Sequence, residues 1–349
     1  MKEILIAFPQ HRGSGHDSMS IYHSNVKEEL INLGWDVLEV IPQNYEIILN
    51  RLLPSLSSII RYTFPVARAT KSWILEYWLF LFFLKLNKSS PPLVAISQEY
   101  APIFNKKKSI VIVHDLIQQN FPRSMQAKIF YKNIIPWALR KCSGIISVSK
   151  TTQSILMQYK ISSSVVYNSI DLAAQEKTQN PKNETKSIST VLWVGTAAKH
   201  KSLDTLLLAA TQTPELTFNV ILPERDSSLI PQPSSNVYFH SNISNHTLRD
   251  LYLNSDIFVS TSLDEGYGRP AMEARILGCR LILSDLSIYR ELHAGAAIFF
   301  PPGDSKMLAI ALKKCIENDT TEFQYNLHGL IAEKDELAKE LSKLALRVL

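Results

Sequence analysis

Two glutamates, Glu265 and Glu273, stand on either side of a turn that contains Gly266, Gly268 and Pro270. This turn joins a short apolar run to a stretch of helical period. A glycine-rich loop that leads into a helix presents backbone N–H groups and the positive end of the helix dipole, which suits phosphate. A carboxylate beside it can accept hydrogen bonds from a ribose diol or from sugar hydroxyls. The pattern therefore suits a nucleotide sugar, although Glu273 by itself could equally be a first-turn acid stabilised by the dipole.

The elements that position this turn are predicted by short apolar runs, which alternate with longer stretches of helical period. Such runs are typical of buried parallel strands, and the alternation is typical of an α/β fold. The expected strands are Ile4–Phe8, Val37–Ile41, Leu93–Ile96, Ile110–Val113, Ile145–Val148, Thr190–Val194, Phe218–Leu222, Val237–His240, Ile257–Ser260, Leu281–Ser284 and Ala297–Phe300. They predict two parallel-sheet domains.

A polar stretch without apolar period, residues 171–187, is the expected linker. We therefore expect an N-terminal domain at residues 1–172 and a C-terminal domain at 188–329. Residues 330–349 carry leucine and alanine at helical spacing and predict an amphipathic helix docked on one or both domains.

Composition narrows the class of protein. The 349 residues are 46% hydrophobic and 20% charged with a formal charge of +5, which excludes a disordered chain and gives no sign of a nucleic-acid binder. The three cysteines, Cys142, Cys279 and Cys315, have no metal-ligand spacing and indicate a reducing compartment. Charge at the N-terminus does not fit a signal peptide, so we expect a cytoplasmic protein.

Beyond these properties, several segments resemble a known family. Glu265–Ala274 resembles the E-x7-E signature of the retaining nucleotide-sugar glycosyltransferases of family 4, which have the GT-B fold. Further resemblances to that family are carried by Val191–Leu203, Val113–Leu116, Gly144–Lys150 and Val165–Asp171. The resemblance implies two Rossmann-like domains that face a cleft, with the acceptor bound mainly by the first and the donor by the second.

Roles follow from the resemblance position by position. Glu273 would bind the ribose, Glu265 would lie near the transferred sugar, and Lys201 would neutralise the diphosphate. His114 would face the donor sugar from the first domain, unless it is simply a satisfied histidine at a strand end. The remaining donor-binding positions implied are Gly195, Thr196, His200, Gly266, Tyr267 and Gly268.

One position departs from the family pattern, and one loop could extend the implied site. The family has an arginine where this chain has His200, so one fixed positive charge is replaced by a group that is mostly neutral at pH 7 unless perturbed. The first predicted strand leads into a loop with Gly13, Ser14 and Gly15, which could approach the donor diphosphate or the acceptor, or could be a plain turn.

No pair of aspartates in the chain has Asp-x-Asp spacing, the pair through which other glycosyltransferases hold a divalent metal ion. We therefore expect a metal-independent enzyme with no cofactor. No nucleophile signature of a hydrolase is present either.

Residues 73–86 are almost continuously apolar and aromatic, and basic residues flank them. Fourteen residues are too few to span a bilayer. The segment could lie on an anionic membrane surface, or it could be a core helix with solvated basic flanks.

Together these features predict a retaining hexosyltransferase that is peripheral to the inner face of the membrane. It would move a hexose from a nucleoside-diphosphate sugar, with GDP-mannose slightly favoured, to a saccharide or lipid-linked saccharide in cell-surface glycan synthesis. Two alternatives stay open: a nucleotide-sugar epimerase of the same fold, and a weakly catalytic subunit that binds nucleotide sugar or a partner enzyme.

Overall fold

A computed structural model describes residues 2–7, 18–40, 45–61, 63, 73–86, 91–101, 108–168, 170, 189–229, 234–317 and 336–349. The expected linker and the loop with Gly13, Ser14 and Gly15 lie outside these residues. The chain divides into two compact units, one made of Met1–Ser169 with Ile331–Leu349 and the other of Ile170–Leu330.

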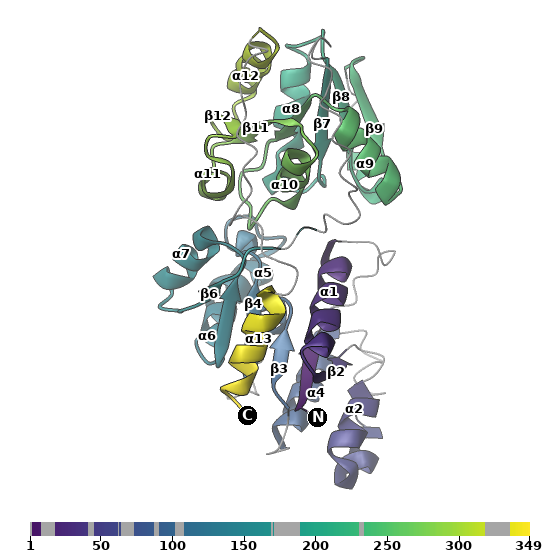
Figure 1. The fold of residues 1–349 in the computed structure, drawn as a ribbon, viewed down its shortest axis with the longest axis vertical. Coiled ribbons are helices and arrows are strands. Elements are labelled where there is room, and N and C mark those ends of the chain that lie inside the picture. Colours follow the sequence, from purple (N-terminus) through teal and green to yellow (C-terminus); the bar gives the residue numbers. More distant parts are fainter. Residues whose placement is uncertain are drawn as a thin grey trace. The chain divides into compact units, whose positions relative to one another are not determined.

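The first unit contains a parallel sheet (Figure 1). Its six strands have the order β2-β1-β3-β4-β5-β6. Its strands are β1 (Lys2–Ala7), β2 (Trp35–Val40), β3 (Leu93–Ala95), β4 (Ser109–Val113), β5 (Gly144–Ser147) and β6 (Ser164–Val165). The middle strands are apolar on both faces and almost wholly buried, as the continuous apolar runs predict. The two-residue β6 is too short to be predicted from an apolar run.

Helices surround this sheet. They are α1 (Ser18–Asn32), α2 (Tyr45–Leu52), α4 (Trp73–Leu86), α5 (Met125–Ile129), α6 (Ile135–Leu139), α7 (Lys150–Gln158) and α13 (Glu336–Leu346). A π-helical turn, Phe130–Ile134, joins α5 to α6.

The second unit repeats the architecture with the sheet order β12-β11-β10-β7-β8-β9. Its strands are β7 (Thr190–Val194), β8 (Thr217–Ile221), β9 (Val237–His240), β10 (Ile257–Ser260), β11 (Arg280–Ser284) and β12 (Ala297–Phe300), and its helices are α8 (Leu203–Ala210), α9 (Asn245–Asn254), α10 (Arg269–Ile276), α11 (Ser287–His293) and α12 (Ser305–Glu317). The expectation of two parallel-sheet α/β domains is confirmed.

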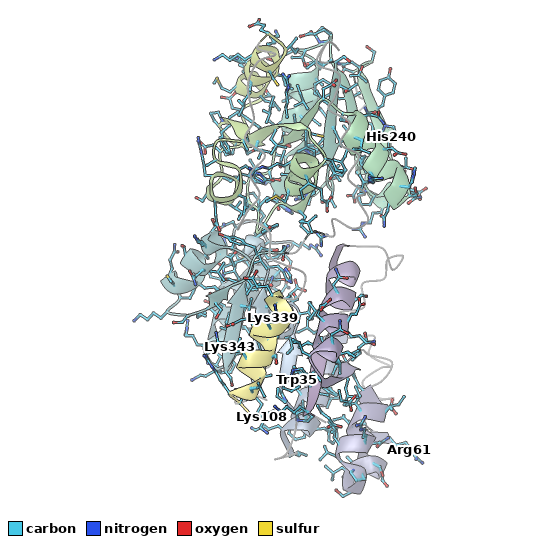
Figure 2. The ribbon with its side chains drawn as sticks, in the orientation of Figure 1. Trp35, Arg61, Lys108, His240, Lys339 and Lys343 are labelled. Atoms are coloured by element: carbon cyan, nitrogen blue, oxygen red, sulfur yellow. The ribbon has the colours of Figure 1, made fainter. Side chains whose placement is uncertain are left out.

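The C-terminal helix α13 belongs to the first unit, although unit 2 precedes it in the chain. It packs against α1 and β4, and Figure 2 shows Trp35 close to the helix that carries Lys339 and Lys343. The indole Nε1 of Trp35 donates to Ser342 Oγ at 2.9 Å, and Ser164 Oγ donates to Glu340 Oε1 at 2.8 Å. The amphipathic helix therefore completes the first unit.

Helix α4 shows which face of the apolar segment is in the core. Phe80 and Phe83 are buried, and Phe80 stacks on Tyr45 of α2 with 5.1 Å between ring centroids. Phe82 and Leu86 are exposed. The helix is thus a core helix along one face and presents apolar side chains on another. Within the described ranges, no helix has the length and apolar character needed to cross a membrane.

Candidate functional site

The predicted donor residues gather in unit 2, where the strand order reverses. Chain connections run from β7 outward to β8 and β9 in one direction, and from β10 to β11 and β12 in the other. Ligands of parallel sheets bind at such a switch point, beyond the carboxyl ends of the strands. The loop after β7 carries Gly195 to Lys201, and the loop after β10 carries Glu265 to Gly268, so both belong to this edge.

The turn before α10 depends on glycine. Gly268 precedes the helix with φ +76°, a left-handed conformation that glycine adopts without strain. A Cβ at this position would lie 2.5 Å from Cε1 of Tyr289, so the ring also requires a residue without a side chain. Pro270 lies in the first turn, as expected.

The other end of α10 is closed by Gly278, which has φ +84°. The Gly278 N–H donates to the Arg275 carbonyl at 3.2 Å, and the Cys279 N–H donates to the Ala274 carbonyl at 2.9 Å. These two bonds form a Schellman motif, which fixes where the helix stops. The helix that carries Glu273 therefore has defined ends on both sides.

The loop after β7 packs closely on its own strand. A Cβ on Gly195 would lie 2.6 Å from the Trp193 ring, so this position also needs glycine. The Ala197 N–H donates to Asp226 Oδ2 at 2.8 Å, and the Ala198 N–H donates to Thr196 Oγ1 at 3.4 Å. Asp226, which no sequence pattern singled out, thus fixes the backbone of the predicted phosphate loop.

Hydrogen bonds to backbone carbonyls fix the segment that carries Lys201. Thr261 Oγ1 donates to the Lys201 carbonyl at 2.8 Å and accepts from Trp193 Nε1 at 3.1 Å. The next residue, Ser202, has φ +46°, an uncommon conformation for a residue other than glycine. The Leu263 N–H donates to the His200 carbonyl at 2.7 Å, which joins the two loops directly.

The side chains of Lys201 and Glu265 form an ion pair between Nζ and Oε1. Only 18% of the Lys201 side chain and 10% of the Glu265 side chain are exposed. Ser262 Oγ donates to the same carboxylate oxygen at 2.9 Å. The structure therefore brings together the two residues expected to contact diphosphate and sugar.

Glu273 has a different environment, one turn into α10. It accepts a hydrogen bond from the Tyr252 hydroxyl at 3.1 Å, and Arg269 Nη2 lies 3.7 Å from its other oxygen. Burial raises the pKa of Glu273, whereas Arg269 and Tyr252 oppose that shift. The Glu273 side chain is 22% exposed, so it lies partly at the surface.

Three partners of the site were missed by sequence reasoning: Asp226, Tyr252 and Tyr289. Each is at least 21 residues away in sequence from the residue to which it is hydrogen-bonded, and each comes from another element. The Arg269–Glu273 pair, in contrast, has the i,i+4 spacing that favours an ion pair on a helix and could have been predicted.

His114 lies in unit 1, at the end of β4. Its Nε2 lies 2.8 Å from the Ile96 carbonyl oxygen, and its backbone N–H donates to Gln98 Oε1 at 3.2 Å. The Nε2 contact fixes the ring, as in a satisfied strand-end histidine. The role of His114 toward the donor sugar stays a prediction.

Across the ranges that the structure describes, no three His, Cys, Asp or Glu side chains come together in a way that could hold a metal ion.

Comparisons with known proteins agree with this architecture. The family model "Glycosyl transferases group 1" matches residues 174–328. The O-antigen chain mannosyltransferase RfbU of Salmonella typhimurium is 24% identical over 254 residues, which are 69% of this chain and 69% of that protein. Sucrose-phosphate synthase of Thermosynechococcus elongatus superposes with a TM-score of 0.66 at 15% identity, over 99% of this chain and 97% of that one.

A second solved structure, Anabaena Alr3699/HepE in complex with UDP and glucose, has a TM-score of 0.63 at 15% identity, over 100% of this chain and 98% of that one. These structures share the two-sheet GT-B fold. The family match and the fold together support a group 1 glycosyltransferase.

Proposed function

We propose that this protein is a retaining, metal-independent hexosyltransferase of family 4 that uses a nucleoside-diphosphate sugar. The observation that carries the proposal is the Lys201–Glu265 ion pair at the switch point of unit 2, beside the helix that carries Glu273. A cation and two carboxylates at this edge match the three parts of such a donor: diphosphate, sugar and ribose.

Each residue would have one task in the reaction. Glu273 accepts hydrogen bonds from the ribose diol, and Glu265 contacts the transferred sugar. Lys201 stabilises the charge that develops on the diphosphate as the bond to the anomeric carbon breaks. The acceptor oxygen bonds to that carbon on the face the diphosphate leaves, and the departing phosphate takes the proton of the acceptor hydroxyl.

The donor and acceptor are proposed from the relatives. The name of the Salmonella protein states a mannosyltransferase of O-antigen chains. We therefore propose GDP-mannose as donor and a saccharide or lipid-linked saccharide as acceptor, in cell-surface glycan synthesis. The Anabaena structure contains UDP and glucose, which makes UDP-glucose the comparison donor.

A donor screen tests the activity. Purified protein is given GDP-mannose or UDP-glucose, with and without saccharide and lipid-linked acceptors, and nucleoside diphosphate release is measured. A transferase releases the diphosphate faster when an acceptor is present and yields a longer saccharide. Conversion of the donor to its epimer, or binding without turnover, would replace this proposal with one of the two alternatives.

We also propose that unit 1 binds the inner membrane face. The exposed Phe82 and Leu86 of α4 lie on a helix that packs against α2, where Ile47 is exposed, and Lys85 is exposed beside them. Arg61, labelled in Figure 2, is exposed nearby in the chain. Apolar side chains with basic neighbours suit an anionic lipid surface.

Liposome co-sedimentation tests this contact. Wild type should sediment with anionic liposomes at low salt, and Phe82→Glu should weaken binding because it places a carboxylate at the surface. Leu208→Glu in unit 2 is the matched control, since Leu208 is 55% and Phe82 47% exposed. Equal sedimentation of both variants and wild type would contradict the proposed membrane contact.

A further inference from the structure

A chain of buried hydroxyl groups runs beneath the loop that carries Glu265. Tyr289 OH lies 2.7 Å from Ser260 Oγ, Ser260 Oγ lies 3.3 Å from Ser262 Oγ, and Ser262 Oγ lies 2.9 Å from Glu265 Oε1. Tyr289, Ser260 and Ser262 are all buried. They come from β10, from the residues just after it and from α11.

The direction of these bonds follows from proton counting. A carboxylate only accepts, so Ser262 donates its one proton to Glu265. Ser260 donates to Ser262, which leaves Tyr289 as the donor to Ser260. Burial raises the pKa of Tyr289 well above its ordinary value, and the charge of Glu265 and hydrogen bonding with it add to the shift, so the phenol keeps the proton it donates.

The Tyr289 ring has a second contact with the same loop. Its Cε1 occupies the space that a Cβ of Gly268 would need. The hydroxyl end therefore lies among Ser260, Ser262 and the Glu265 carboxylate, while the ring edge meets the glycine three residues later in the loop. Both contacts act on the segment between Glu265 and α10.

From this arrangement we infer that Tyr289 is a positioning residue for Glu265, acting on its carboxylate directly and through Ser260 and Ser262. Hydrogen bonds in such a chain polarise one another, so that Ser262 is a better donor when Ser260 accepts from Tyr289. The inference rests on the proposed function, in which Glu265 contacts the transferred sugar. Loss of the Tyr289 hydroxyl should therefore lower turnover and leave nucleotide affinity unchanged.

A double-mutant cycle tests the chain. Tyr289→Phe and Ser260→Ala should each lower kcat about three- to tenfold, the size expected for one hydrogen bond, with the Kd of the nucleoside diphosphate unchanged within about twofold. The double variant should lose about as much as Tyr289→Phe alone, because that variant already removes the first donor of the hydroxyl chain. The inference would be overturned if the kcat of the double variant fell by the product of the two single losses, or if nucleotide affinity fell as much as kcat.

Ser284→Ala is the matched control. Ser284 is buried and its Oγ donates to the Ser260 carbonyl at 3.2 Å, so it lies beside the chain without belonging to it. This variant should keep kcat within about twofold of wild type, since its hydroxyl sends no bond to Glu265. A loss as large as that of Tyr289→Phe would assign the effect to general packing and overturn the inference.

A spectroscopic readout separates this inference from the proposed function. The side-chain carboxyl 13C resonance of Glu265, assigned by its disappearance in Glu265→Gln, should move in Tyr289→Phe and Ser260→Ala and stay in Ser284→Ala. This measurement needs no turnover, so a wild type without transfer activity would refute the function while the spectra still decide on the chain. An unmoved resonance in both variants would overturn the inference.

Discussion

The carboxyl ends of the two sheets are built differently. In unit 2 this edge carries the Lys201–Glu265 ion pair, the Glu273 carboxylate and a chain of buried hydroxyls. In unit 1 the same edge carries His114, whose ring is fixed by a backbone carbonyl. Buried charged groups are costly unless they are satisfied, so an edge with this many of them is organised before a ligand arrives.

In the proposed function, unit 2 supplies the chemistry and unit 1 contributes binding and orientation. The following predictions test this division, from the largest expected effect to the smallest.

Glu265→Gln should lower kcat by about a hundred- to a thousandfold, the size typical of losing one group that acts on the transition state. Nucleoside diphosphate affinity should change little, because the proposed partner of Glu265 is the sugar. Steady-state kinetics and calorimetry on one preparation make the measurement. A large loss of diphosphate affinity would assign Glu265 to the nucleotide instead.

Glu273→Ala should weaken nucleotide sugar and free nucleoside diphosphate alike, by about ten- to a hundredfold, since both contain the ribose. Binding by wild type should also weaken as the pH falls through the raised pKa of Glu273, because the protonated carboxyl loses acceptor capacity. Calorimetry across a pH series measures both. Unchanged diphosphate affinity in Glu273→Ala would remove this residue from the ribose site.

Because of His293, we expect the free energy of unfolding of unit 2 to decrease at acid pH. It is fully buried beside Tyr289 and Arg275, and among the described residues neither ring nitrogen has a hydrogen-bond partner. Burial, with Arg275, lowers the pKa of His293 to about 3. The unfolded chain binds a proton at His293 below about pH 6.5, whereas the folded protein does so only near pH 3. The free energy of unfolding is therefore highest above about pH 6.5 and decreases as the pH falls toward 3.

Between pH 7 and pH 5 this loss amounts to about 2 kcal/mol of unfolding free energy. Urea unfolding at both pH values measures it, and His293→Leu should reduce the difference because no proton can bind there in the unfolded chain. Equal pH sensitivity in wild type and His293→Leu would show that His293 is not its source.

His114→Asn should lower kcat about tenfold or less, with nucleoside diphosphate affinity unchanged, because His114 belongs to unit 1 and contacts only the sugar in the proposal. The effect should be smaller than that of Glu265→Gln. If His114→Asn abolished turnover as completely as Glu265→Gln, the chemistry would be shared by both units and the contrast between them would fail.

Removal of divalent ions should change the transfer activity least of all. Lys201 supplies the positive charge for the diphosphate, so activity measured in EDTA should equal that in buffer. Loss of turnover that Mn²⁺ restores would contradict the proposed metal independence.

The sequence predicts the two sheets well and the site only in part. Apolar runs of four or five residues correspond to buried parallel strands, and Thr190–Val194 and Ala297–Phe300 have the predicted bounds. The motif residues Glu265, Gly268 and Glu273 could be found because their spacing is local. Tyr252 and Tyr289 could not, because their contacts depend on which strands become neighbours and on how α9 and α11 pack.

The buried face of helix α4 could not be predicted from the sequence either. Its residues are nearly all apolar, so the sequence has no polar face from which the direction of Phe82 could be predicted. The packing of Phe80 on Tyr45 and the burial of Leu81, Phe83 and Leu84 show which face is inside.

The central claim is that the Lys201–Glu265 site of unit 2 transfers a hexose with retention. Its most direct test is the anomeric configuration of the product, followed by proton NMR, for wild type and Glu265→Gln given GDP-mannose and a saccharide acceptor. The account predicts an α-mannoside from the α-linked donor, formed far more slowly by Glu265→Gln. A β-linked product, or equal rates for the two proteins, would contradict it.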